Sequence, residues 1–155
     1  MQRFDPISTP WRDKTRGRVA DAARAARGLL DTSVIVDLEH LDLASLPLEA
    51  AVSALTFAEL AAGPHATTDP AERARRQDRI QRLEAATSPI RFGVSAARAY
   101  GRVFAAVASA GRKPRGAHAV DLMIAATALA EGLPLFTRNP NDFAALGGLV
   151  EIVAV

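Results

Sequence analysis

Four acidic residues in separate segments of the chain could together perform metal-dependent chemistry: Asp31, Glu59, Asp121 and Asp142. The first three lie among apolar neighbours, where an unpaired carboxylate is costly. Two unit charges ~4 Å apart also repel by about 4 kcal/mol at an effective dielectric of 20. If these side chains meet, they therefore need either a bound cation or retained protons.

The ligand types favour a hard divalent cation. The chain has no cysteine, and carboxylate oxygens suit Mg²⁺ or Mn²⁺ better than zinc. Such an ion can activate water and contact a phosphate oxygen. Clustered acids with a divalent cation are typical of phosphodiester hydrolysis.

Each acid also has a purely structural interpretation. Asp31 could cap a following helix, and Asp121 could favour a helix N-terminus through the macrodipole. Glu59 could face solvent, and Asp142 could cap a last helical turn. Both interpretations stay open on the sequence alone.

Further polar residues stand close to these acids in the sequence. The hydroxyls of Thr32, Ser33 and Thr137 could orient water, although capping and strand-end hydrogen bonds explain them equally well. A basic turn near Asp121 could contact phosphate or be a solvated loop; its residues are Arg112, Lys113 and Arg115. His118, one turn before Asp121, could also contact a substrate phosphate, although we favour a structural or hydrogen-bonding role because no second histidine stands nearby. Acids interleave with the arginines of a long helix, which indicates a salt-bridged exposed face: Arg75, Arg76, Arg79 and Arg82.

The elements that must position these residues alternate between strands and helices. Short strands alternating with helices predict a parallel sheet covered on both faces, in which a site lies beyond the carboxyl ends of the strands. We therefore expect an α/β fold with three α/β/α layers and a central, mainly parallel five-stranded sheet. The expected strands are 29–31, 51–54, 90–94, 135–137 and 149–155. The expected helices are 56–62, 70–86, 95–110 and 119–131. We expect Thr56, Asp69 and Ser95 to cap the N-termini of the first three helices, and Gly132 to end the fourth.

Length and composition fit one globular domain with a tail. The chain has 155 residues, of which 49% are hydrophobic and 23% charged. The absence of cysteine excludes disulfide frameworks and cysteine nucleophiles and fits the cytoplasm. No apolar run approaches the ~20 residues of a membrane span, and no secretory signal is evident.

Charge divides the chain into two parts. The formal net charge is +2, yet residues 1–28 carry seven basic side chains against three acidic ones. Residues 29–155 are therefore mildly acidic. We predict a basic extension over 1–28, loose or partly helical, with a short helix over 19–27, and one folded domain over 29–155.

Four segments resemble the acidic motifs of PIN-domain ribonucleases, in the same order. They are Leu30-Asp31-Thr32-Ser33-Val34-Ile35, Thr56-Phe57-Ala58-Glu59-Leu60, Asp121-Leu122-Met123-Ile124-Ala125-Ala126-Thr127-Ala128 and Thr137-Arg138-Asn139-Pro140-Asn141-Asp142-Phe143. Order and spacing are most similar to VapC-type toxins of VapBC toxin–antitoxin pairs. The resemblance covers residues 29–155.

The resemblance implies a Mg²⁺-dependent endoribonuclease that acts on a structured RNA, commonly a tRNA or rRNA loop, and leaves a 5′-phosphate. It also implies a homodimer and a small antitoxin that folds over the site. By motif match, Asp31, Glu59 and Asp121 correspond to metal ligands. The fourth acid matches Asp142, with Asn139 as a polar supporting residue, because relatives place that acid at either position.

Other enzyme classes fit less well. A haloacid-dehalogenase-like phosphatase needs a second Asp where this chain has Ser33, and a response-regulator receiver needs a late lysine, whereas no lysine follows Lys113. Two alternatives within the family stay open: an RNA-processing PIN nuclease outside toxin–antitoxin biology, and a catalytically weak scaffold that binds RNA or protein.

Overall fold

The central element of the fold is one parallel sheet, seen in a computed structural model that describes residues 24–114 and 116–155. Its strands are β1 (Arg27–Leu30), β2 (Glu49–Val52), β3 (Leu135–Thr137) and β4 (Ile152–Ala154). They are arranged in the order β2-β1-β3-β4, and every pairing is parallel. The predicted α/β class with a parallel sheet is thus confirmed.

The described part of the chain contains four strands instead of the five expected. Residues 90–94 form a single parallel bridge, between Ile90 and Ser53, because the chain continues into a helix at Val94. The last strand is also shorter than expected. The amides of Leu149 and Val150 donate to the carbonyl of Leu146, so both residues close the preceding turn before β4 begins.

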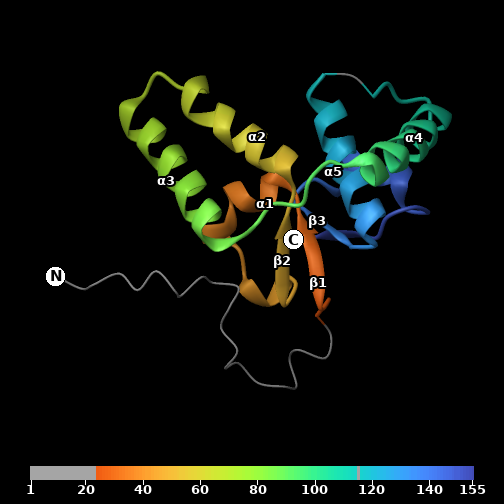
Figure 1. The fold of residues 1–155 in the computed structure, drawn as a ribbon, viewed down its shortest axis with the longest axis horizontal. Coiled ribbons are helices and arrows are strands. Elements are labelled where there is room, and N and C mark those ends of the chain that lie inside the picture. Colours follow the sequence, from red (N-terminus) through yellow and green to blue (C-terminus); the bar gives the residue numbers. More distant parts are fainter. Residues whose placement is uncertain (1–23, 115) are drawn as a thin grey trace.

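Helices cover both faces of the sheet (Figure 1). One face carries α1 (Thr32–Val36), α2 (Ala54–Ala62) and α3 (Pro70–Ala86), and the other carries α4 (Val94–Ser109) and α5 (Ala117–Glu131). Short 3-10 helices link them: η2 (Leu38–His40), η3 (Leu43–Ser45), η4 (Gly63–Ala66) and η5 (Pro140–Leu146). The three layers expected from the alternation are therefore present.

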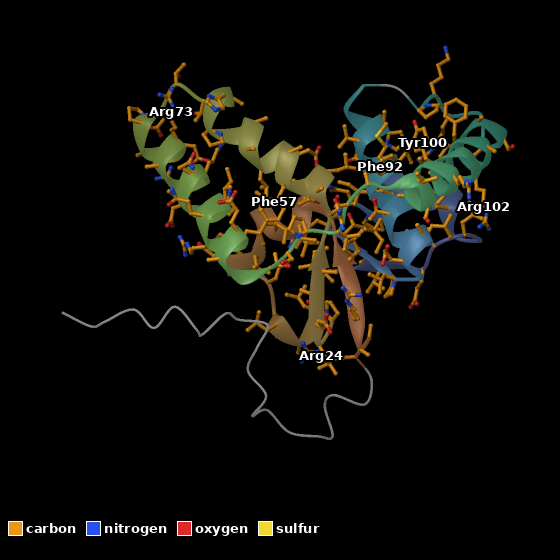
Figure 2. The ribbon with its side chains drawn as sticks, viewed as in Figure 1. Arg24, Phe57, Arg73, Phe92, Tyr100 and Arg102 are labelled. Atoms are coloured by element: carbon orange, nitrogen blue, oxygen red, sulfur yellow. The ribbon has the colours of Figure 1, made fainter. Side chains whose placement is uncertain are left out.

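Two buried clusters explain why both faces are covered. Successive strand residues point to opposite faces, so Leu29 of β1 packs with α4 and α5, whereas Leu30 packs with α1, α2 and α3. Phe57 of α2 packs against the second cluster, and Phe92 and Tyr100 pack against the first (Figure 2). This two-sided burial is the reason that β1 and β2 are apolar at successive positions where they are buried, at Leu29–Leu30 and Ala51–Val52.

Helix ends follow local chemistry, in part at other residues than expected. Asp69 caps α3 by accepting from the Ala71 amide, and Gly132 ends α5 in the left-handed conformation, at φ 64°; both predictions are confirmed. The caps expected at Thr56 and Ser95 were wrong. Ser53 caps α2 by accepting from the Thr56 amide, and α4 begins after Gly93.

The predicted basic extension falls mainly on residues outside the described part of the chain, 1–23. Arg27 and Gly28 belong to β1, so the expected short helix does not reach them. Arg24, at the lower end of the sheet in Figure 2, donates to the carbonyls of Leu43, Leu46 and Pro47. No helix in the described residues is long and apolar enough to cross a membrane.

Candidate active site

The carboxyl edge of the sheet brings two of the predicted segments together. Leu30 pairs with Val52 on one side and with Phe136 on the other, so Asp31 after β1, Ser53 after β2 and Thr137 at the end of β3 lie at the same level. The chain crosses from β2 on one side of β1 to β3 on the other. The edge between β1 and β3 is therefore a topological switch point, where ligands bind in open α/β sheets.

Asp31 is buried, with 4% of its surface exposed, and its carboxylate is held by three donors. The Thr32 amide donates to Oδ1 at 2.8 Å, which confirms that Asp31 caps α1. The hydroxyls of Ser33 and Thr137 donate to Oδ2 at 2.8 Å and 2.9 Å. Capping alone uses one oxygen, so the two hydroxyls fix the orientation of the other, and this supports a role beyond the cap.

These two hydroxyls are themselves held by the strand end. The Ser33 hydroxyl accepts from the Arg138 amide at 3.1 Å, and the Thr137 hydroxyl accepts from the Asn139 amide at 3.0 Å. Thr137 is fully buried. The segment after β3 thus locks the rotamers of the groups that hold Asp31. The sequence indicated these hydroxyls as candidates, but it contained no signal that Ser33 and Thr137 share one carboxylate oxygen.

Glu59 lies in the middle of α2 and is half-buried. Its Oε2 accepts a hydrogen bond from the Thr32 hydroxyl. Thr32 also directly follows Asp31 and donates its amide to that residue. One residue therefore connects the first acid to the second, which the sequence did not predict.

Asp121 shows that the acids are close enough to influence one another. It is the fifth residue of α5, beyond the first turn, so a macrodipole role does not account for it. Its pKa is raised to about 6, first by burial and then by the negative charges of Asp31 and Glu59. His118, whose Nδ1 lies 3.8 Å from the Asp121 carboxylate, acts in the opposite direction.

Asp142 lies in the first turn of η5 and is exposed. Its charge contributes a smaller rise to the pKa of Asp121, so it faces the same region from further away. It makes no side-chain cap to η5, and Asn139 beside it is also exposed. The structure thus brings Asp31, Glu59 and Asp121 together and leaves Asp142 and Asn139 at the rim.

The basic turn is connected to the same rim. The guanidinium of Arg112 donates to the Asn141 carbonyl at 2.9 Å, which joins the loop between α4 and α5 to η5. Lys113 is exposed, and Arg115 lies outside the described residues. Arg112 is therefore engaged in holding the segment that carries Asp142.

The donor set suits a divalent cation, although the carboxylates do not form a closed cage. Within residues 24–114 and 116–155, no three Asp, Glu or His side chains are arranged to hold one ion directly. Mg²⁺ keeps several water ligands and commonly uses only one or two carboxylates. The raised pKa of Asp121 shows that anionic charge at this edge is unfavourable without a counter-charge, and a cation would supply one.

Comparisons with known proteins fit this geometry. The family model of the PIN domain matches residues 28–149. No curated protein matches the sequence.

Several solved structures are similar to the chain. A member of the VapBC family of toxin–antitoxin systems, VapBC-5 from Mycobacterium tuberculosis, is 37% identical over 84% of this chain and 99% of that chain, with a TM-score of 0.74. FitAcB from Neisseria gonorrhoeae is 26% identical over 80% and 94%, with a TM-score of 0.62. VapBC2 from Rickettsia felis, bound to a DNA fragment from its promoter, shares the fold, with 24% identity over 81% and 96% and a TM-score of 0.65.

Proposed function

Because this chain belongs to the PIN domain family, we propose that it is a metal-dependent endoribonuclease and the toxin of a type II toxin–antitoxin pair. Its 37% identity to the VapBC family member supports the toxin assignment. The observation that carries the nuclease assignment is the meeting of Asp31, Glu59 and Asp121 at the carboxyl edge of the sheet: Thr32 joins the first two by hydrogen bonds, and their charges, in addition to burial, raise the pKa of Asp121. Three acids from distant segments acting on one another are what a cation-dependent hydrolase requires.

The proposed metal ligands are Asp31 and Asp121, with Glu59 and Asp142 binding directly or through water. Mg²⁺ fits these oxygen donors, and Mn²⁺ would also fit. When bound, the ion would activate water for attack on phosphorus and offset charge on the phosphate oxygens. In the overall reaction the water oxygen bonds to phosphorus and the bond to the 3′ oxygen breaks, which leaves a 5′-phosphate and a 3′-hydroxyl.

The chain's own residues prepare the site for this reaction. Ser33 and Thr137 hold the Asp31 carboxylate in one orientation, and Thr32 holds Glu59. Asp121, with a pKa of about 6, loses its proton as the pH rises through 6, so at neutral pH it is available to a cation. His118, close to Asp121, is a candidate contact for substrate phosphate, together with Lys113 and Arg115 of the basic turn.

Partners are proposed on the same basis. The similar structures include a VapBC family member and FitAcB, which supports a small antitoxin as the protein partner. We further propose a structured RNA such as tRNA or rRNA as substrate, a homodimer as the assembly and the cytoplasm as the location.

A catalytically weak PIN scaffold is the second candidate. It is favoured by the exposed position of Asp142 and Asn139 and by the lack of a direct three-ligand set among the described residues. Such a scaffold would bind RNA or a protein without cleaving RNA.

Cleavage assays distinguish the two candidates. The purified protein should cut tRNA or rRNA with Mg²⁺ and stop with EDTA, and Asp121→Asn should abolish cutting while the circular dichroism stays unchanged. Glu84→Gln is the matched control, because Glu84 is exposed on α3 and has no ion pair with a described residue. Equal rates for the Asn variant and the parent would refute the proposed site, and no cutting by the parent would favour the scaffold. Growth arrest on expression, rescued by a small neighbouring open reading frame, would establish the toxin role.

A further inference from the structure

A cavity of about 290 Å³ adjoins Glu59 on the α1, α2 and α3 side of the sheet. Helices α2 and α3 run side by side on that face (Figure 1). Thr32 and Glu59 line the end of the cavity that belongs to the candidate site, and Val36 and Leu60 contribute apolar surface. Arg76 and Arg79 of α3 line it as well. The remaining charged residue of the lining is Glu72, whose carboxylate is paired with Arg75 and Arg76. The cavity thus combines one acid of the site, Glu59, with an apolar wall and two cations, one of them already paired.

The arginines of α3 differ in their partners. Arg75 and Arg76 both bind Glu72, and the Arg76 guanidinium also donates to the Gly63 carbonyl at 2.8 Å. Arg82 pairs with Asp78. These three fit the salt-bridged face expected from the sequence.

Arg79 departs from that expectation. It is half-buried against the cavity, and it makes no hydrogen bond or ion pair with any residue in the described part of the chain. A partly buried guanidinium loses hydration without gaining a partner, so an anionic ligand would be favourable there. Its fork of donors matches phosphate geometry.

The size and lining of the cavity indicate what would carry that anion. Pockets for small molecules span about 300–1,000 Å³, so this cavity suits a single small group. An apolar wall beside a guanidinium matches a nucleoside with its phosphate, since a base packs on apolar side chains while the phosphate meets the cation. Glu59 lies on the same cavity, which places such a nucleotide next to the proposed cleavage site.

We propose that this cavity binds the nucleotide that flanks the cleaved bond, with Arg79 holding its phosphate. The proposal rests on the nuclease function above and adds a positioning residue that the acidic motifs do not include. Arg79 acts on the RNA strand and not on the reacting atoms, so its loss weakens binding more than it slows the chemical step.

The test measures RNA binding without cleavage. In the Asp121→Asn background, a fluorescein-labelled single-stranded oligoribonucleotide is titrated at a series of salt concentrations. One phosphate contact to single-stranded nucleic acid contributes about 0.7 to the slope of log affinity against log salt. Arg79→Gln should lower the slope by about 0.7, which extrapolates to a Kd about fourfold higher at 0.15 M salt. Arg79→Lys should retain the slope, because it retains the charge.

Arg82→Gln is the matched control, since it removes the same charge from the same helix outside the cavity lining. Identical Kd values and slopes for the Arg79→Gln and Arg82→Gln variants, with unchanged melting temperatures, would overturn the proposal. Unchanged RNA binding with lost binding of a poly-glutamate peptide would assign the cavity to a protein partner and would overturn it too.

Parallel cleavage assays separate this proposal from the proposed function. With Asp121 intact, Arg79→Gln should raise KM for the same RNA about fourfold by the same slope argument and leave kcat unchanged. Cleavage by the parent without a slope change at Arg79 would refute the nucleotide site alone. A slope change without cleavage by the parent would refute the nuclease and keep an RNA-binding site. No RNA binding by any form would refute both.

Discussion

The pKa of Asp121 makes stability depend on pH in a direction that can be measured. Its pKa is raised from 3.8 to about 6. Between roughly pH 4 and pH 6 the native protein therefore holds a proton that the unfolded chain has lost. Because the native state binds more protons in this window, stability falls as the pH rises through it, and the full cost is present above pH 6.

The size of this cost follows from the shift. Two pKa units correspond to about 3 kcal/mol, at about 1.4 kcal/mol per unit. The Asp121 side chain is 29% exposed, so water and salt screen part of the repulsion. We expect about 1–2 kcal/mol to remain. Asp121→Asn removes both the charge and the proton, so its effect on the free energy of unfolding should be more favourable at pH 7.5 than at pH 4 by that amount.

Urea unfolding of the parent and the Asn variant in EDTA, at both pH values, measures this difference. Glu84→Gln, an exposed acid on α3, should show no comparable pH dependence. Saturating Mg²⁺ should stabilise the parent at pH 7.5 and leave the variant unchanged, because a ligand stabilises only the state that binds it. If the Asn substitution has the same effect at both pH values, neither burial nor the charges of Asp31 and Glu59 raise the pKa of Asp121, and Asp121 is not part of a charged cluster at this edge.

Two further substitutions test the support of the site and the packing of the sheet. Thr137→Val keeps the shape of a buried side chain but removes the donor to the Asp31 carboxylate, so it should lower the free energy of unfolding in urea by about 2 kcal/mol and weaken Mg²⁺ binding measured by calorimetry. The control is Thr127→Val, which loses only a hydrogen bond to a helix carbonyl and should leave the Mg²⁺ affinity unchanged. Equal effects of the two substitutions on Mg²⁺ affinity would contradict the role of Thr137 in holding Asp31. Gly28→Ala would drive a Cβ into the buried ring of Phe136 and should lower the free energy of unfolding by about 1–3 kcal/mol in the same measurement. The control is Gly101→Ala, because Gly101 has open space around it. If Gly28→Ala leaves the stability unchanged, the ring of Phe136 can move.

Local chemistry allowed much of the fold to be predicted from the sequence. Asp69 and Pro70 start α3, and Gly132 ends α5, because a capping carboxylate, a fixed φ and a left-handed glycine act within one turn of the chain. The alternation of strands and helices likewise indicated a covered parallel sheet. What failed was the strand at 90–94, because strand formation needs a neighbour, and Ile90 meets only Ser53 beyond the end of β2.

For the site, the sequence determined the residue types and their order along the chain, since these are properties of the motifs. Only the tertiary structure decided which side chains meet. Strand register sets Asp31 beside Thr137, and the packing of α2 brings Glu59 to Thr32. Arg79 shows the same limit: its spacing in α3 is that of its ion-paired neighbours, and only the packing of α1 and α2 against that helix gives it a cavity in place of a carboxylate.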